Sequence, residues 1–267
     1  MESLDDSGYL SPSITEWIGK HRASNFAWFD LVERVNRVCQ RLMLSLEPPT
    51  SDEQRVYVAI LFSRVLSHCQ GLVLLSERGM VTETQSLLRS MLEVTFATVA
   101  IAKHSNVAAE YRLDDLHQRK KCIESFKQLP LELRQFHRLD TVDLEKLSDD
   151  LKREIDTKKV KRLTTEYLAQ KADMLNHYKT LYVLLSGSTH ARIADVVRAL
   201  EVDEQSEIQG LKWGPDVDGI SDLLGPVCDW LFISARNVST LFANDKYDKE
   251  LQDCWEEYES LWNSRSL

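Results

Sequence analysis

Glycine and proline are scarce in this sequence, which has 9 Gly and 6 Pro among 267 residues. Strand-rich folds need turns at short intervals, so this scarcity argues against them and favours long helices with few connections. We predict an all-α protein: a single helical domain at residues 14–267, built as one bundle of seven to nine helices, after a flexible tail at residues 1–13. A small loop or hairpin is expected near residue 210, where Gly210, Gly214 and Pro215 lie close together.

Apolar residues recur at helical spacing in several long stretches that are bounded by capping and breaking residues. We expect helices at 26–46, 52–78, 82–103, 107–129, 218–242 and 246–262. Ser51, followed by Gln54, predicts a capping box at the start of the second helix. The polar stretch Leu131–Thr157 predicts a surface helix or helical hairpin interrupted near Asp140, and Thr164–Lys171 predicts a connector.

Paired cysteines and long apolar runs are also absent. The five cysteines are far apart and form no CxxC pair, so neither a disulfide framework nor a zinc ribbon is indicated. The longest uncharged apolar run, Val94–Ala102, has nine residues, whereas a membrane-spanning helix needs about 20. The acidic N-terminal stretch lacks the apolar core of a signal peptide. We therefore expect a cytoplasmic protein with no membrane segment and no membrane partner.

Common enzyme signatures are missing too. The sequence contains no Walker A loop, GxGxxG, HExxH, DxDxDG or GxSxG motif and no Glu-x-x-His pair, so we expect no cofactor and no metal. The net charge of −9 gives no general attraction for nucleic acid. Binding to RNA would therefore require a local basic patch, for which Arg119–Lys121 and Lys158–Arg162 are the candidates.

Two predicted helices carry polar residues spaced four apart among apolar neighbours. One is Thr82–Lys103 and the other is Asp173–Arg192. The polar residues are Gln85, Arg89 and Glu93 in the first and Tyr178, Tyr182, Ser186 and His190 in the second. Four residues are slightly more than one helical turn, so each set forms a slowly winding stripe. Because buried polar groups need hydrogen-bond partners, we predict that the two stripes face each other.

This candidate cluster allows two interpretations. Ser186 and His190 are four residues apart, and a Ser–His contact activates a hydroxyl when a third group, here Glu93 or Arg89, orients the imidazole. The alternative is a satisfied polar cluster that fixes packing and helix register.

A second, weaker candidate pair is Arg112 and His117. Their Arg-x4-His spacing matches the active-site signature of the HEPN ribonucleases, a family of small helical bundles. The mechanism would need no metal, since a His base takes the proton of the 2′-hydroxyl and an Arg stabilises the phosphate charge. With 18 Arg and 7 His in the chain, about one such match is expected by chance.

The two organising stretches also resemble a known family. The string Leu87-Leu88-Arg89-Ser90-Met91-Leu92-Glu93 and the later Tyr182-x-x-x-Ser186-x-x-x-His190 are similar to the R-S-x-x-E and Y-x-x-x-S-x-x-x-H helices of an uncharacterised family of bacterial helical proteins. The resemblance spans roughly Arg64–Phe242. It implies a helical, distantly HEPN-like fold and carries no activity with it.

Two functional classes follow from these observations. The first is a HEPN-like module acting on RNA in stress or phage defence, through a local basic patch. The second is a non-enzymatic helical scaffold or partner-binding protein, with a homodimer among the options. Exposure of the candidate cluster of Arg89, Glu93, Tyr182, Ser186 and His190 in a cleft would favour the enzyme, and its burial would favour the scaffold.

Overall fold

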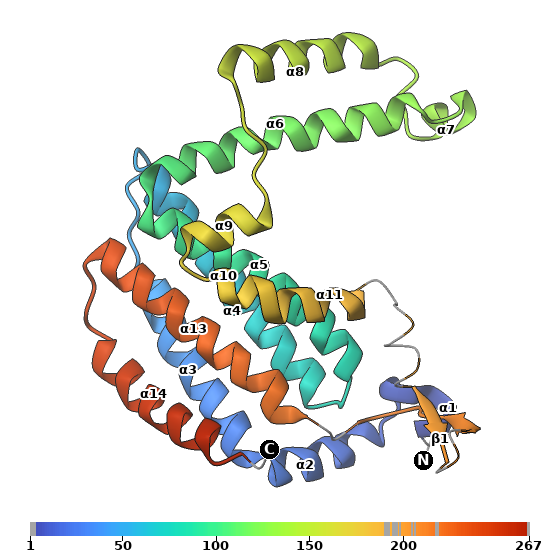
Figure 1. Cartoon of the computed structure of the whole chain (residues 1–267), viewed down its shortest axis with the longest axis vertical. Coiled ribbons are helices and arrows are strands. Elements are labelled where there is room, and N and C mark those ends of the chain that lie inside the picture. The colour runs from blue at the N-terminus through green and yellow to red at the C-terminus, as the bar shows by residue number, and fades with distance from the viewer. Residues whose placement is uncertain are drawn as a thin grey trace.

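The computed structural model describes residues 4–189, 193, 197, 199–203, 205, 207–216 and 219–265. In this part the chain is a helical bundle with one small β-hairpin, which confirms the all-α prediction (Figure 1). The helices are somewhat more numerous than the seven to nine expected, because short helical segments lie between the long ones.

Long helices form the body of the described chain. They are α3 (Phe26–Leu44), α4 (Glu53–Ser76), α5 (Val81–Lys103), α13 (Ile220–Phe242) and α14 (Asp248–Asn263). α4 packs along α5, α13 contacts α3, α4 and α5, and α14 covers α3 and α13. Each of these helices begins and ends within two residues of its predicted bounds, since apolar periodicity and breaking residues fix helices of this length.

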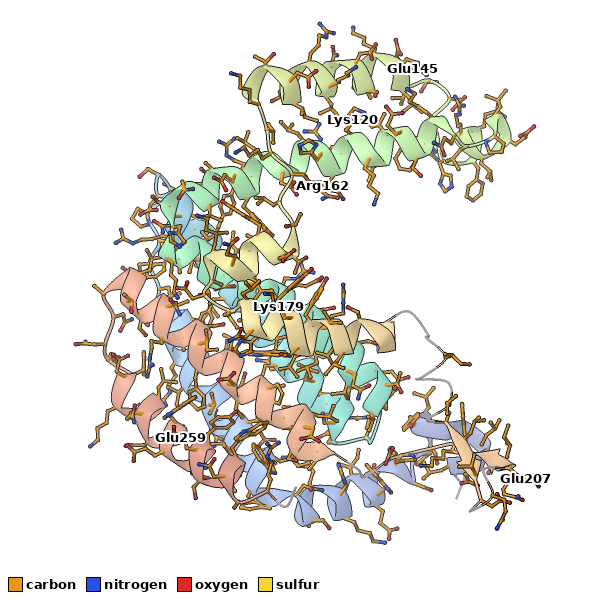
Figure 2. All side chains as sticks on the ribbon, in the orientation of Figure 1. Lys120, Glu145, Arg162, Lys179, Glu207 and Glu259 are labelled. Carbon is orange, nitrogen blue, oxygen red and sulfur yellow. The ribbon has the colours of Figure 1, made fainter. Side chains whose placement is uncertain are left out.

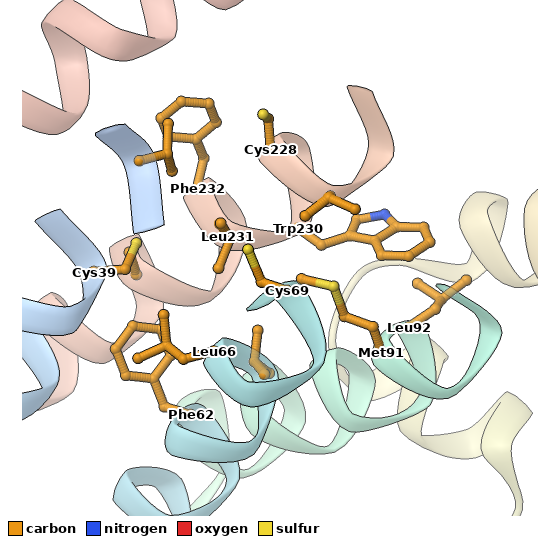
Figure 3. Close-up of a cluster of buried hydrophobic side chains, with 14 of the residues drawn as sticks. Cys39, Phe62, Leu66, Cys69, Met91, Leu92, Cys228, Trp230, Leu231 and Phe232 are labelled. Atoms are coloured by element: carbon orange, nitrogen blue, oxygen red, sulfur yellow. The ribbon is translucent and has the colours of Figure 1, made fainter. Parts of the chain in front are cut away.

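Aromatic, aliphatic and sulfur-containing side chains from these helices form one buried cluster (Figure 3). Trp230 of α13, Phe62 of α4 and Phe96 of α5 are fully buried. Cys39, Cys69 and Cys228 are also buried, and burial raises the pKa of each thiol. These thiols therefore remain protonated at neutral pH and contribute to packing.

Two local predictions were wrong. The cap of α4 is Asp52, whose Oδ1 accepts the Arg55 amide at 3.0 Å, so the capping box predicted at Ser51 does not form. The predicted connector Thr164–Lys171 is a short helix, α9 (Thr165–Lys171), capped by the Thr164 hydroxyl. In the first case the capping side chain is one residue later than predicted, and in the second the Thr164 hydroxyl starts a helix where none was expected.

An arm projects from the body at one end (Figure 1). It consists of α6 (Ser105–Lys127), α7 (Leu131–Phe136) and α8 (Leu144–Lys158). α7 and α8 lie in the stretch Leu131–Thr157, where a surface helix or hairpin with a break near Asp140 was predicted, and α8 packs against α6. α8 packs on α6 through the buried residues Leu144, Ser148 and Leu151, and the Ser148 hydroxyl donates to Glu124. The chain then returns to the body through α9.

The predicted hairpin near residue 210 is confirmed. β1 (Leu200–Val202) and β2 (Ile208–Leu211) pair antiparallel, with Leu200 opposite Leu211. The stretch expected to be a flexible tail carries α1 (Leu4–Ser7) and η1 (Gly8–Leu10), and the Tyr9 hydroxyl donates to the Gly214 carbonyl at 2.6 Å. The N-terminal helix α2 (Ile14–Ser24) follows.

Among the described residues, α4 has the length and apolar composition that a membrane-crossing helix requires. In this structure it packs against α3, α5 and α13 inside the bundle. A buried core helix of a folded domain meets the same criteria of length and hydropathy.

Candidate functional site

The two polar stripes meet between α5 and the segment that follows α9. That segment comprises α10 (Leu175–His177), the π-helical turn η2 (Tyr178–Tyr182) and α11 (Val183–Thr189). α5 contacts both η2 and α11. The predicted contact between the stripes is therefore confirmed for Arg89, Glu93, Tyr182 and Ser186, which we call the Arg89 cluster. His190 lies outside the described residues.

The Arg89 guanidinium is the centre of the cluster. Its Nη2 donates to the Tyr182 hydroxyl at 2.6 Å and lies 3.2 Å from Glu93 Oε1, while its Nε donates to Ser186 Oγ at 3.2 Å. The guanidinium carbon also lies 4.5 Å from the centre of the Tyr182 ring. Hydrogen bonds to a charged group and a cation–π contact act together here, so Arg89 links α5 to α11 strongly.

The Tyr182 hydroxyl connects Arg89 to Glu93 through hydrogen bonds. Its hydroxyl donates to Glu93 Oε1 at 2.9 Å, and its ring stacks on Tyr178 with centroids 4.9 Å apart. Burial raises the pKa of Tyr182, and the hydrogen bond to the Glu93 carboxylate raises it further. Tyr182 therefore stays protonated at neutral pH and serves as a donor.

Ser186 is not arranged as a nucleophile. Its hydroxyl donates to the Tyr182 carbonyl at 2.7 Å and accepts from Arg89. The proton of the Ser186 hydroxyl is therefore engaged in a hydrogen bond to the helix backbone, whereas an activated serine gives its proton to a base. The Arg89 side chain is 18% exposed and that of Glu93 is 36% exposed, so the cluster is half-buried.

Comparison with known protein families gives one match, and it covers the residues of the Arg89 cluster. One family model matches residues 55–207, which is more than half of the chain, and it is described as a family of unknown function, DUF5677. The chain belongs to the DUF5677 family. Searches of curated proteins and of solved structures gave no match.

The DUF5677 region runs from α4 to the hairpin and includes the Arg89 cluster and the whole arm. It excludes α13 and α14, although α13 contacts α4 and α5 throughout the core. The helices outside the DUF5677 match therefore complete the hydrophobic core of the matched region.

The weaker candidate pair, Arg112 and His117, lies inside the DUF5677 match, but the two side chains contact different parts of the chain. Arg112 Nε lies 2.5 Å from Glu53 Oε1 at the start of α4, whereas His117 Nε2 lies 3.1 Å from the Val160 carbonyl after α8. Side chains five positions apart on an α-helix point in clearly different directions, which explains why Arg112 and His117 have different neighbours. Arg112 and His117 do not form a joint site in this structure.

A further polar pair, which the spacing of residues did not predict, lies at the edge of the DUF5677 match. His177 Nε2 lies 3.2 Å from Asp229 Oδ2, and both residues line a cavity between η2, α13 and α14. The available signal was Asp229, a single acid in the apolar stretch of α13. Within the described ranges, no group of three His, Cys, Asp or Glu side chains is placed to hold a metal ion.

Proposed function

We propose that this protein is a non-enzymatic helical scaffold that assembles as a homodimer through its arm. The observation that carries the proposal is the exposed apolar tip of the arm. The Arg89 cluster supports a structural role as well, because its side chains bond to one another and join two helices.

The arm tip with α7 and the β1–β2 hairpin lie at the two ends of one side of the molecule (Figure 1), and both carry exposed apolar side chains. At the arm tip, Phe136 is 80% exposed and Leu131 is 59% exposed. On and after the hairpin, Trp213 is 81% exposed and Leu211 is 71% exposed. Exposed apolar patches mark interaction sites, and a two-stranded hairpin gains stability when another surface covers it.

Charge favours the docking of one surface on the other. Residues 105–162, which form the arm and its return, carry 14 Lys and Arg against 12 Asp and Glu in a chain of net charge −9. Residues 199–216, around the hairpin, carry one Lys against five Asp and Glu. In a two-fold dimer the arm of each copy meets the hairpin of the other, so both contacts form at once.

Hydrogen bonds and an ion pair fix the conformation of the arm tip. Arg134 of α7 donates from Nε to the Leu129 carbonyl and from Nη2 to the Lys127 carbonyl, each at 2.8 Å. Lys127 in turn pairs with Glu145 of α8 at 2.7 Å. A tip that is already ordered loses less conformational entropy when it binds.

Phe136→Glu is expected to raise the dimer dissociation constant about 30-fold, because it places a charge at the centre of an apolar contact. Light scattering coupled to size-exclusion chromatography measures the mass across a concentration series. Ile60→Glu is the matched control: Ile60 is 58% exposed on α4, away from both surfaces, and its variant should remain dimeric.

A complementation experiment tests the two-fold arrangement. Trp213→Glu alone should also give monomers. A mixture of Phe136→Glu and Trp213→Glu retains one intact arm and one intact hairpin, so it should form a heterodimer through one contact. A wild-type protein that stays monomeric at every concentration, or variants that dimerise as wild type does, would exclude the proposal.

One specific observation favours a second candidate, the HEPN-like action on RNA. The two basic runs meet around His117, because the Val160 carbonyl lies against His117 and the Leu163 amide donates to Asp114. Arg119, Lys121, Lys159, Lys161 and Arg162 are exposed there. Figure 2 shows Arg162 and Lys120 in this part of the arm.

If this patch binds RNA, the double variant Lys161→Ala/Arg162→Ala should lose about tenfold in affinity and lower the salt slope by about 2. Fluorescence polarisation with mixed-sequence RNA, repeated over a salt series, measures both quantities. The control is Lys152→Ala/Arg153→Ala on the exposed face of α8. Cleavage of the RNA in chelator that is lost in His117→Ala would establish an enzyme, and no RNA binding by wild type would eliminate this candidate.

A further inference from the structure

A cavity of about 380 Å³ lies between η2, α13 and α14, apart from the Arg89 cluster. Its walls combine aromatic and acidic side chains. The lining residues are His177, Leu181, Pro226, Asp229, Trp255, Tyr258, Glu259, Trp262 and Asn263. The volume lies in the range of small-molecule sites in proteins.

The aromatic wall comes from one face of α14. Trp255, Tyr258 and Trp262 are spaced three and four residues apart, so their rings follow one another along the helix. The centroids of Trp255 and Tyr258 are 5.3 Å apart, and those of Tyr258 and Trp262 are 5.8 Å apart. Gly225 of α13 leaves room for Trp262, since a Cβ there would lie 2.2 Å from its Cζ3.

Two acidic side chains also line the cavity. Asp229 belongs to α13, and Glu259 belongs to α14 and is exposed. Among the described residues, Asp229 is paired with His177, whose Nε2 lies 3.2 Å from Asp229 Oδ2. The residues lining this cavity include no Lys and no Arg, so neither carboxylate faces a permanent cation from the cavity wall.

Tyr258 adds a polar group to the aromatic wall. The residue as a whole is only 8% exposed, and none of the described residues forms a hydrogen bond with its hydroxyl. The hydroxyl oxygen is not fully buried, so it is accessible to water or to a ligand in the cavity that Tyr258 lines. Burial and the nearby Asp229 charge raise the pKa of Tyr258, so the hydroxyl keeps its proton.

The same protein holds its own cations between a ring and a carboxylate. Arg22 lies 4.8 Å from the Phe29 centroid and 3.0 Å from Glu77. Arg265 lies over one face of Trp262, 3.1 Å from its centroid, and pairs with Asp222 at 2.9 Å. Aromatic faces attract cations, and nearby carboxylates strengthen the attraction.

We propose that this cavity binds a small organic cation, a quaternary ammonium ion of the size of choline. The aromatic wall of α14 contacts the methyl groups, and Asp229 and Glu259 balance the charge. The hydroxyl of such a ligand bonds to the Tyr258 hydroxyl, which forms no hydrogen bond with the residues that the structure describes.

Choline and 3,3-dimethyl-1-butanol, its neutral isostere, form the decisive pair of probes. Calorimetry with the full chain, at ionic strength held constant with KCl, should show choline binding at least about tenfold more tightly than the alcohol. Quenching of tryptophan fluorescence on titration gives a second readout. Equal binding of both compounds, or no binding of choline, would overturn the proposal.

Two variants locate the site. Asp229→Asn should weaken choline binding about tenfold, because Asp229 is the more buried carboxylate. Glu259→Gln, at an exposed position that folding does not depend on, should weaken it about threefold. Glu256→Gln on the same helix lies outside the cavity and should bind as wild type does. An equal loss in Glu256→Gln and Glu259→Gln would indicate only surface charge and would refute the site.

Discussion

Arg89→Ala is expected to lower the free energy of unfolding by about 2–3 kcal/mol, since it removes charge-assisted hydrogen bonds from a half-buried site. The loss includes the bonds to Tyr182 and Ser186, the ion pair with Glu93 and the stacking on the Tyr182 ring. Full burial of the cluster would have implied about 3–5 kcal/mol. The 36% exposure of Glu93 lowers this figure, because water solvates the carboxylate once Arg89 is gone.

Urea denaturation followed by circular dichroism measures this loss. Arg64→Ala is the matched control, because Arg64 is exposed on α4 and should cost little. Arg89→Lys should fall between wild type and Arg89→Ala, since lysine keeps the charge and loses the fork of donors. An Arg89→Ala variant as stable as wild type would mean that Arg89 is free to bind a ligand, and the enzyme hypothesis would then regain support.

Gly79→Ala is expected to cost about 3 kcal/mol, which combines a strained backbone with a steric clash. Gly79 has a φ of +67°, in the left-handed region that favours glycine. A Cβ there would lie 2.6 Å from the Asp216 carbonyl oxygen and 2.6 Å from the Trp17 ring. The Asp216 amide donates to the Gly79 carbonyl at 3.0 Å, so the clash would separate the α4–α5 corner from the chain before α13.

Gly19→Ala is the control for this prediction. Gly19 lies in α2, and a Cβ added there would have no neighbouring atom within 4 Å, so alanine should stabilise the helix by about 0.5–1 kcal/mol. Thermal unfolding of both variants gives the comparison. A Gly79→Ala protein with an unchanged melting temperature would show that the corner and the Asp216 segment are not in contact in solution.

Helix positions and the main contact of the cluster were accessible from the sequence. Apolar periodicity fixes α3, α4, α5 and α13, because these helices bury one face along their whole length. The spacing of four in each stripe correctly predicted that Arg89 and Glu93 meet Tyr182 and Ser186. The reason is general, since a polar stripe in an apolar helix requires partners.

Other features depend on packing that spacing does not encode. Trp255, Tyr258 and Trp262 have the spacing of an ordinary core face, and only the position of α13 and η2 turns them into the wall of a cavity. Likewise, the polar stretch Leu131–Thr157 predicted a surface helix or hairpin, but not the packing of α8 on α6 that makes the arm. Ile60 shows the same limit at a single residue, because it is apolar and lies in the apolar helix α4, yet it is 58% exposed.

The π-helical turn at Tyr178–Tyr182 makes chain length, as well as residue identity, a determinant of the Arg89 cluster. One residue added to or removed from a helix turns everything beyond it by about 100°. A relative one residue shorter between Met174 and Tyr182 would keep the tyrosine and serine at the same spacing, yet α11 would present another side to α5. Such a relative would keep the residues of the motif but would lose the hydrogen bonds between the two helices. Counting residues across this turn is therefore the way to decide which members of the family share the cluster.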